Sequence, residues 1–482
     1  MKYIVAIDQS TSGSKGFLVD ENGDVVRRLS LKHAQFYPKS GYVEHDANEI
    51  YENVVKLIDG VTDGIDKRDI QALALANQRE TSVIWDRKTG LPLCNAIVWQ
   101  DVRGEKACAE LKEYDEYIHT TTGLNLSPYY PAGKIRALFE ERPDIRQRAQ
   151  NGEVRIGTID SYLLWRLAGA DATDTTNAGR TQLMRLDKLE WDKKALDIFE
   201  IPSCCMAEKI LPADAEYGFY KGIPVTGVMG DSHGSLFGLG CLEAGMAKTS
   251  YGTGSSVLMN TGFKPIISDK GLTTSVAFSY GGKTYYVLEG NVTSSGDTLV
   301  WLCSGLGLFK DPAEIEQLAR SVQDSDGVQL VPAMSGLGAP YFDTLARAVL
   351  CGMNRGTTKA HVAYAGLASI AQQITDILEV MNEASGYKTE VLRADGGGSR
   401  NSLLVQLQAD LAGCSVSCAT ADEITGLGVA YVAGLKTGMY KSFAEIPANA
   451  RKSVVYNPAA DRTRAQTMRA QWKTAIRRTM LK

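Results

Sequence analysis

An aspartate that follows a short apolar run is the first residue whose setting indicates chemistry. Ile4–Ile7 runs directly into Asp8, and seven small or polar residues from Gln9 to Lys15 follow. Backbone N–H groups and hydroxyls in such a loop bind phosphate oxygens. Asp8 would repel phosphate, but it could hold a divalent ion through water, and the ion would bridge to phosphate. We interpret the stretch as a phosphate loop beside a metal-associated acid; the alternative is a plain hairpin whose hydroxyls satisfy their own backbone.

A second stretch of the same kind lies in the C-terminal half. Ala247 to Asn260 reads AKTSYGTGSSVLMN, again small residues and hydroxyls before an apolar run. Two such stretches indicate two domains that each offer a phosphate-sized loop, with the boundary near Leu242–Met246. We therefore divide the chain into residues 1–244 and 245–482. The sequence has no P-loop motif and no GxGxxG after a strand, which argues against those two nucleotide sites.

Composition narrows the class of protein. A chain of 482 residues exceeds one ordinary hydrophobic core, so more than one domain is expected. The chain is 44% hydrophobic, its net charge is -4, and no apolar run approaches a membrane span, so we expect a soluble protein without nucleic-acid or membrane partners. Nine scattered cysteines and no recognisable signal peptide favour the reducing cytoplasm.

The loops are positioned by alternating strands and helices. Phe17–Val19 reads as a strand, and Glu21–Asp24 as the hairpin turn after it. A helix should begin near Asp46, whose carboxylate caps it while Glu49 reaches back. The same alternation continues toward the C-terminus, so the predicted fold class is α/β.

Two later segments carry small residues four positions apart. One contains Gly234 and Gly238, and the other contains Gly426, Ala430 and Gly434. On a helix this spacing places the small residues on one face, where another backbone can come close. Ordinary tight packing is one interpretation, and a helix–helix hinge between the domains is the other.

Ten segments resemble, in order, the FGGY carbohydrate kinases, and within that family the glycerol kinases most closely. They extend from near residue 3 to near residue 440 and read IVAIDQSTSGSKG, YVEHD, ANQRET, NAIVWQD, DTTNAGRT, GVMGDSHGSLFG, YGTGSS, GLGAPYFD, RADGGGSRN and ITGLGVAY. The resemblance implies two actin-like (ribonuclease H-like) ATPase domains flanking a central cleft. It also implies ATP and Mg2+ as cofactors and transfer of the γ-phosphate to a terminal hydroxyl of a small polyol or sugar. We further expect a homodimer.

The matched segments assign roles to individual residues by resemblance. Asp8 matches the magnesium-associated acid, and Asp231 the catalytic base. Residues implied in substrate binding are Arg79, Glu80, Trp99, Tyr129, Asp231, Ser232 and Ser256. Residues implied in binding the nucleotide and its phosphates are Thr11, Ser12, Gly13, Lys15, Thr253, Gly296, Gly397 and Asn401.

Structural interpretations stand beside the functional ones. Arg79 and Glu80 could form a surface ion pair, although a polyol with adjacent hydroxyls needs such a charged donor and acceptor. Trp99 could be a core residue rather than a face for the C–H side of the substrate. Asp231 could cap the helix after it, and both roles could hold together. A non-catalytic nucleotide-binding sensor with the same domains is the alternative function.

Departures from the glycerol kinases concern the substrate and one nucleotide contact. Ser232 stands where they have glutamine, Ser256 where they have an aromatic residue, and Lys15 where arginine is usual. Val300 replaces a glutamine that contacts nucleotide. A buried hydroxyl without a partner costs about 1–3 kcal/mol, so the two serines predict a roomier, more polar pocket. Glycerol is the nearest named substrate, but this pocket favours erythritol, a pentitol, or a ketose such as xylulose or ribulose.

Overall fold

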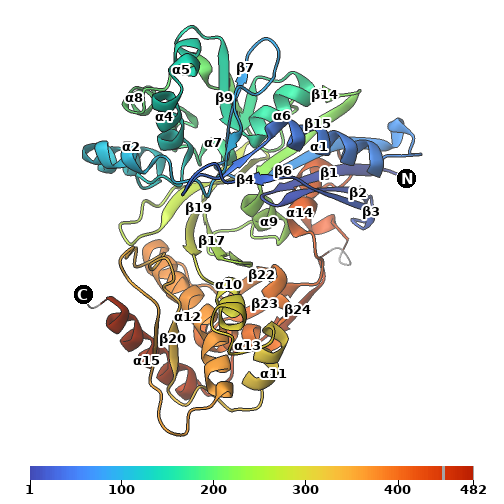
Figure 1. The fold of residues 1–482 in the computed structure, drawn as a ribbon. Helices are drawn as coiled ribbons and strands as arrows, with labels where there is room; N and C mark the ends of the chain where they lie inside the picture. The colour runs from blue at the N-terminus through green and yellow to red at the C-terminus, as the bar shows by residue number, and fades with distance from the viewer. Residues whose placement is uncertain (448–450, 481–482) are drawn as a thin grey trace.

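Two lobes, each built on its own sheet, make up the computed structural model, which describes residues 1–447 and 451–480 (Figure 1). The upper sheet has the order β14-β15-β6-β1-β2-β3, with bounds Phe219–Tyr220, Ile223–Gly230, Ile70–Asn77, Tyr3–Ser10, Gly13–Asp20 and Val25–Lys32. The lower sheet has the order β18-β19-β17-β16-β22-β23-β24, with bounds Thr273–Tyr280, Lys283–Val292, Ser255–Gly262, Ala247–Tyr251, Val391–Asp395, Ser415–Ala419 and Ser453–Tyr456. Helices accompany both sheets, and the predicted α/β class is confirmed.

The opening strand pair is a tight hairpin. β1 pairs antiparallel with β2 almost to their ends, so only Thr11 and Ser12 form the turn. The predicted loop from Gln9 to Lys15 is therefore too long, and Lys15 lies within β2 opposite Asp8. The reason is that ladder hydrogen bonds satisfy the backbone groups of these polar residues as well as they would those of apolar ones.

The helix predicted after Asp46 is α1 (Ala47–Val61). The Asp46 carboxylate accepts hydrogen bonds from the N–H groups of Asn48 and Glu49 at 2.8 and 3.3 Å. The predicted reach of Glu49 back to this cap is wrong, because its carboxylate accepts instead from the backbone N–H of Ala34 at 3.1 Å. Its apolar face, which recurs at helical spacing, is buried and contains Ile50, Val54, Leu57 and Ile58.

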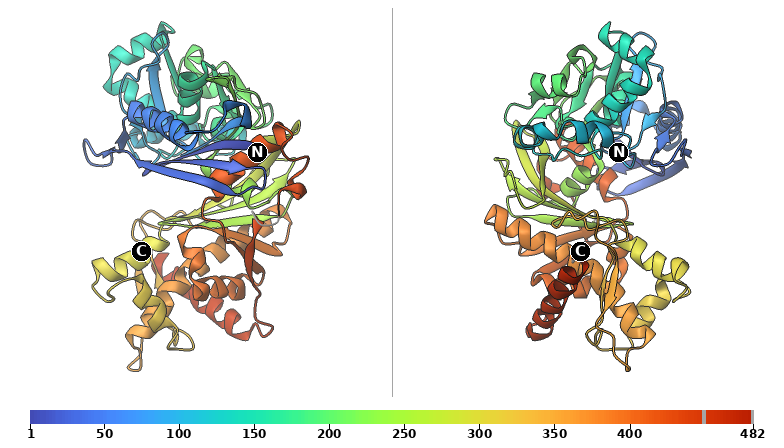
Figure 2. Two further views of the ribbon diagram at one scale, coloured as in Figure 1. Left: turned by 90° about the vertical axis from the view of Figure 1, so that its right-hand side faces the viewer. Right: turned by 60° about the vertical axis from the view of Figure 1, so that its left-hand side comes forward.

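The two glycine-bearing segments form α9 (Asp231–Gly238) and α14 (Ile424–Lys436), which pack against each other. A Cβ atom on Gly428 would lie 1.9 Å from the carbonyl oxygen of Gly234, so the two backbones nearly touch. Although α14 comes late in the chain, it covers the sheet of the upper lobe beside β1 and β6. Figures 1 and 2 show this orange-red helix against the blue strands. The close approach is confirmed, and the hinge stays a prediction.

Two features bear on the broad predictions from composition. All nine cysteines are free thiols, and two of them, Cys414 and Cys418, lie directly before β23 and within it. None of the helices in the described ranges is both long enough and apolar enough to cross a bilayer.

Replacing Gly428 with alanine tests the α9–α14 contact. The added methyl group would meet backbone rather than a side chain that can move, so Gly428→Ala should lower the free energy of unfolding by about 1–3 kcal/mol. Urea or thermal unfolding measures this loss. Lys436→Ala, at an exposed position of α14, is the control and should change stability by less than about 0.5 kcal/mol. Equal stability of the two variants would contradict the contact.

Candidate functional site

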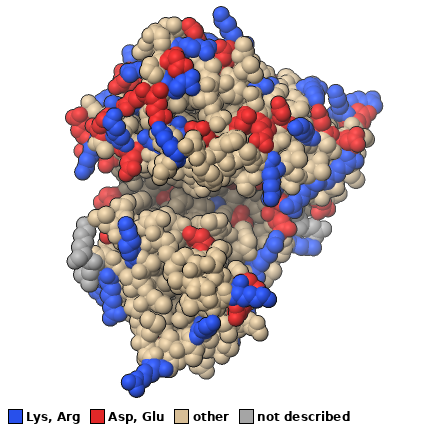
Figure 3. Space-filling model, in the orientation of Figure 1, with Lys and Arg blue, Asp and Glu red and all other residues tan. Residues whose placement is uncertain are grey.

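A recess separates the two lobes on the face shown in Figure 3. Asp231 is the first residue of α9, directly after β15, and its side chain is 35% exposed. The N-cap position belongs to Gly230, so the interpretation of Asp231 as a helix cap is wrong by one residue. Asp231 instead accepts a hydrogen bond from the N–H of Ser232 at 2.6 Å. Its carboxylate is therefore held at a helix start while staying accessible.

Five charged residues meet beside this carboxylate. Arg79 donates from both terminal nitrogens to Glu289, each at 2.9 Å, and its Nε lies 3.4 Å from Asp231. Arg180 donates to Glu289 at 2.8 Å and to Glu80 at 2.6 Å. Both arginines and both glutamates are buried, so the surface-ion-pair interpretation of Arg79 and Glu80 is wrong. The cluster joins the loop after β6 to β19 of the other lobe.

Charge pairing governs the electrostatics of this cluster. Burial by itself would raise the pKa of Glu289, but Arg180 and Arg79 outweigh burial and hold that pKa well below its usual range. Arg79 correspondingly has a pKa raised well above its usual value, against burial, by Glu289 and Glu80. Glu80 has a left-handed backbone with φ of 60°, which is uncommon outside glycine. Strained backbone of this kind clusters at functional sites.

The predicted aromatic residues lie together and contact the first turn. The Trp99 ring is half-buried, lies 5.7 Å from the Tyr129 ring, and donates through Nε1 to the Thr11 hydroxyl at 2.9 Å. The buried Lys134 ammonium donates to the carbonyls of Val98, Trp99 and Tyr129 at 3.1, 2.9 and 2.8 Å. Trp99 is thus not a simple core residue. These contacts couple the aromatic pair to the turn between β1 and β2.

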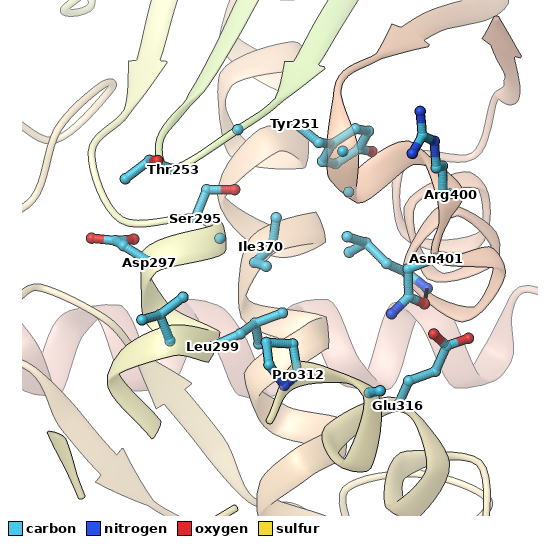
Figure 4. Close-up of a pocket in the computed structure, with 17 residues that line it drawn as sticks. Tyr251, Thr253, Ser295, Asp297, Leu299, Pro312, Glu316, Ile370, Arg400 and Asn401 are labelled. Atoms are coloured by element: carbon cyan, nitrogen blue, oxygen red, sulfur yellow. Dashed lines mark hydrogen bonds between the residues drawn. The ribbon is translucent and has the colours of Figure 1, made fainter. Parts of the chain in front are cut away.

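A cavity of about 720 Å³ in the lower lobe gathers the four predicted nucleotide residues of the C-terminal half (Figure 4). Thr253 comes from the turn after β16 and Gly296 from the start of α10 (Gly296–Val300). Gly397 follows β22, and Asn401 caps α13 (Ser402–Ala412). Thr253 and Gly397, which are 144 positions apart along the chain, therefore line the same pocket. Val300 also lines it.

The residues of the first turn have varied surroundings. Ser12 is exposed and Gly13 begins β2. Lys15 is not free for phosphate in this structure, because its ammonium lies 2.9 Å from the Glu423 carboxylate. The side chains of Thr11 and Lys15 bond to distant residues, so the alternative in which hydroxyls of this hairpin satisfy only their own backbone does not describe it.

Asp8 is buried at the end of β1, and its surroundings fit a bound cation. Burial, followed by repulsion from Asp231, raises the pKa of Asp8 to about 7, although Lys15 opposes the shift. Within residues 1–447 and 451–480, no three His, Cys, Asp or Glu side chains converge into a complete metal site. Mg2+ typically takes one or two carboxylates and keeps water and substrate phosphates as its other ligands. A carboxylate short of positive partners fits that mode.

Sequence reasoning missed three charged residues of the site: Arg180, Glu289 and Lys134. Two of them had a visible signal, because Glu289 directly follows an apolar run and Arg180 is the next-to-last residue of the quoted DTTNAGRT segment. The two substrate-side serines are half-buried, Ser232 in α9 and Ser256 in β17. The contact of Ser256 with Lys248 could not be read from spacing.

Comparison with known proteins shows which family both lobes resemble. The N- and C-terminal domain models of the FGGY family of carbohydrate kinases match residues 3–238 and 247–437. Glycerol kinase 2 of Thermotoga maritima is 40% identical over 100% of this chain and 99% of its own, and glycerol kinase 1 of that organism is 42% identical over 99% of each. The crystal structure of Plasmodium falciparum glycerol kinase with ADP superposes with a TM-score of 0.95, at 34% identity over 100% of this chain and 99% of that one. These likenesses confirm the two actin-like domains.

Removing the charge of Glu289 tests the buried cluster. Glu289→Gln leaves two buried arginines with too few carboxylates, so the free energy of unfolding should fall by about 3–5 kcal/mol. Chemical denaturation followed by circular dichroism measures the loss. Glu153→Gln removes one partner of the exposed pair with Arg148 and should cost at most about 1 kcal/mol. A similar small loss for both variants would refute the assigned role of the cluster.

Proposed function

This chain belongs to the FGGY family of carbohydrate kinases and is an ATP-dependent phosphotransferase that acts on an alcohol, and we propose that its acceptor is an acyclic polyol of the glycerol type. Full-length relatives at about 40% identity are glycerol kinases. The observation that carries the proposal is the Asp231 carboxylate, which is 35% exposed and held 3.4 Å from Arg79 Nε. A carboxylate in that position supports proton removal from an alcohol.

Asp231 acts as the general base in this proposal. As the polyol oxygen forms its bond to the γ-phosphorus and the bond to ADP breaks, the hydroxyl proton passes to the Asp231 carboxylate. The Arg79 Nε and the N–H of Ser232 hold that carboxylate in one orientation. Positioning of this kind supplies a large part of kinase catalysis.

The charged cluster and the aromatic pair bind the polyol. Arg180 Nη2 is a buried donor without an acceptor among the described residues. A substrate hydroxyl oxygen can accept a hydrogen bond from it. Arg79 and Glu80 offer a further donor and acceptor. Trp99 and Tyr129 present apolar ring surface to the C–H side of the substrate. A chain with a hydroxyl on each carbon matches this alternation of polar and apolar surface.

The nucleotide lies in the lower-lobe cavity in this proposal, with its phosphates toward the recess. That cavity is lined by Thr253, Gly296, Gly397 and Asn401. From the upper lobe, the phosphates would be contacted by Thr11, Ser12, Gly13 and Lys15. For Lys15 this requires release from Glu423. When bound, Mg2+ neutralises charge on the phosphates. Asp8 would hold it through water.

Several parts of the assignment stay predictions. The homodimer and the cytoplasmic location are among them, as are the boundary near residue 244 and the absence of nucleic-acid partners. A ketose or larger polyol is the alternative acceptor, favoured by Ser232 and Ser256. A non-catalytic sensor is the alternative in another class, and the first experiment below separates it from a kinase.

Asp231→Asn should lower kcat for polyol phosphorylation by about 10²–10⁴, because the amide cannot accept the proton. ADP release measured with a coupled assay gives this rate, while ATP binding and thermal stability should persist. Glu243→Gln is the control, because the Glu243 side chain is exposed and has no side-chain partner among the described residues. An undiminished rate in Asp231→Asn would remove the base role, and an inactive wild type would favour the sensor.

Gly397→Leu tests the nucleotide cavity. No atom lies within 4 Å of a Cβ atom built on Gly397, so the new side chain fits the protein but occupies cavity space. The KM for ATP should rise roughly tenfold or more, which corresponds to about 1.4 kcal/mol of lost binding. Isothermal calorimetry with ADP checks the same loss without turnover. Unchanged nucleotide affinity in a folded variant would place the nucleotide elsewhere.

A further inference from the structure

One face of the lower-lobe sheet is polar where it meets the upper lobe. Ser256 of β17 lies opposite Ser250 of β16 and opposite Asn291 of β19. Two positions further along β17, Leu258 lies opposite Lys248 of β16 and opposite Glu289 of β19. Residues directly opposite in neighbouring strands point to the same side of a sheet. These five polar side chains therefore share one face, the face from which Glu289 reaches Arg79.

Lys248 is a buried cation of this face without an ion-pair partner. Its side chain is fully buried, and its ammonium donates to the hydroxyls of Ser250 at 2.8 Å and Ser256 at 3.3 Å. Across the described part of the chain, no carboxylate oxygen lies within 4.0 Å of that ammonium. A buried charge that is paired only with hydroxyls is costly, so a role beyond packing is expected.

The Lys248 contact fixes what Ser256 can do. An ammonium group donates hydrogen bonds and cannot accept one. The Ser256 oxygen must therefore accept from Lys248, and its own O–H is left to donate. No acceptor in residues 1–447 or 451–480 receives a hydrogen bond from that O–H, and the Ser256 side chain is only half-buried. Ser256 is thus an oriented donor that needs an oxygen from outside the protein.

This donor lies next to the site that positions the base. Asn291, directly opposite Ser256, donates to the Glu289 carboxylate at 3.3 Å. Glu289 binds Arg79, which in turn contacts Asp231. The charge of Lys248 interacts most strongly with that of Asp395 and then with those of Arg79, Asp231 and Glu289. One ligand that reaches Asp231 can therefore extend toward Ser256.

We infer that Lys248 and Ser256 form a subsite for an additional hydroxyl oxygen of an acyclic polyol with four or five carbons. The inference rests on the proposed polyol kinase activity and specifies its substrate class. Ser256 donates to the substrate oxygen, and Lys248 is a positioning residue that acts through Ser256. Glycerol, whose three carbons are engaged near Asp231, leaves the Ser256 proton without an acceptor.

The experiment compares kcat/KM for glycerol, erythritol and xylitol in the full-length protein. In Ser256→Ala, the ratio of kcat/KM for the preferred longer polyol to that for glycerol should fall about three- to tenfold, as expected for one lost hydrogen bond. The change should appear mainly in KM. Ser256→Thr keeps the hydroxyl and should keep most of the ratio.

Lys248→Met tests the positioning role, since the freed Ser256 hydroxyl can then rotate. In Lys248→Met the ratio should fall relative to the wild type, as it does in Ser256→Ala. The double variant should show no further fall, because both changes remove the same interaction. Ser250→Ala removes the other hydroxyl partner of Lys248 and is the matched control; its ratio should stay within about twofold of the wild type. If the Lys248 variant does not fold, the two Ser256 variants decide.

The outcomes separate the subsite from the proposed function. A wild type that turns over glycerol but neither longer polyol overturns the subsite and leaves the polyol kinase standing. The subsite is also overturned, and the polyol kinase left standing, if Ser256→Ala loses activity equally on all three substrates or loses activity on none of them. A wild type without activity on any polyol refutes the proposed function itself.

Discussion

The bidentate pair between Arg79 and Glu289 is the interaction on which the site depends. It joins the loop after β6 in one lobe to β19 in the other, and both side chains are buried. Two buried charges must be paired with good geometry, because desolvation otherwise outweighs their attraction. Arg180 and Glu80 complete that pairing. The cluster therefore specifies one arrangement of the two lobes around the recess more than it adds stability.

Residues far apart in sequence reach the site through this arrangement. Arg79 brings Asp231 to the cluster, while Lys134 gathers three carbonyls and so places Trp99 and Tyr129. Trp99 then donates to the Thr11 hydroxyl, which links the aromatic pair to the turn between β1 and β2. The residues proposed to contact substrate and phosphate and to act as the base thus form one connected network. Such a network suits a reaction that requires positioning of two substrates.

Much of the local structure could be predicted because its causes are local. The strands around Asp8, the cap at Asp46 and the close approach at Gly234 all follow from periodicity, capping and residue size. The extent of the first loop could not, because polar residues extend a ladder when a neighbouring strand offers partners. The reach of Glu49 failed for a similar reason, since Ala34 supplied a competing N–H.

By itself, the sequence determined the family and the α/β class, because these depend on residue identity and order, and it predicted most of the side chains placed in the proposed site. Only the tertiary structure decided how the charges combine: Glu289 pairs with Arg79 across 210 positions, and α14 returns to the first sheet. It also decided that Lys248, which forms no direct ion pair within the described residues, donates to Ser250 and Ser256. Long-range pairing depends on which surfaces the packed sheets and helices bring within a few ångströms, and no short-range pattern in a chain records that.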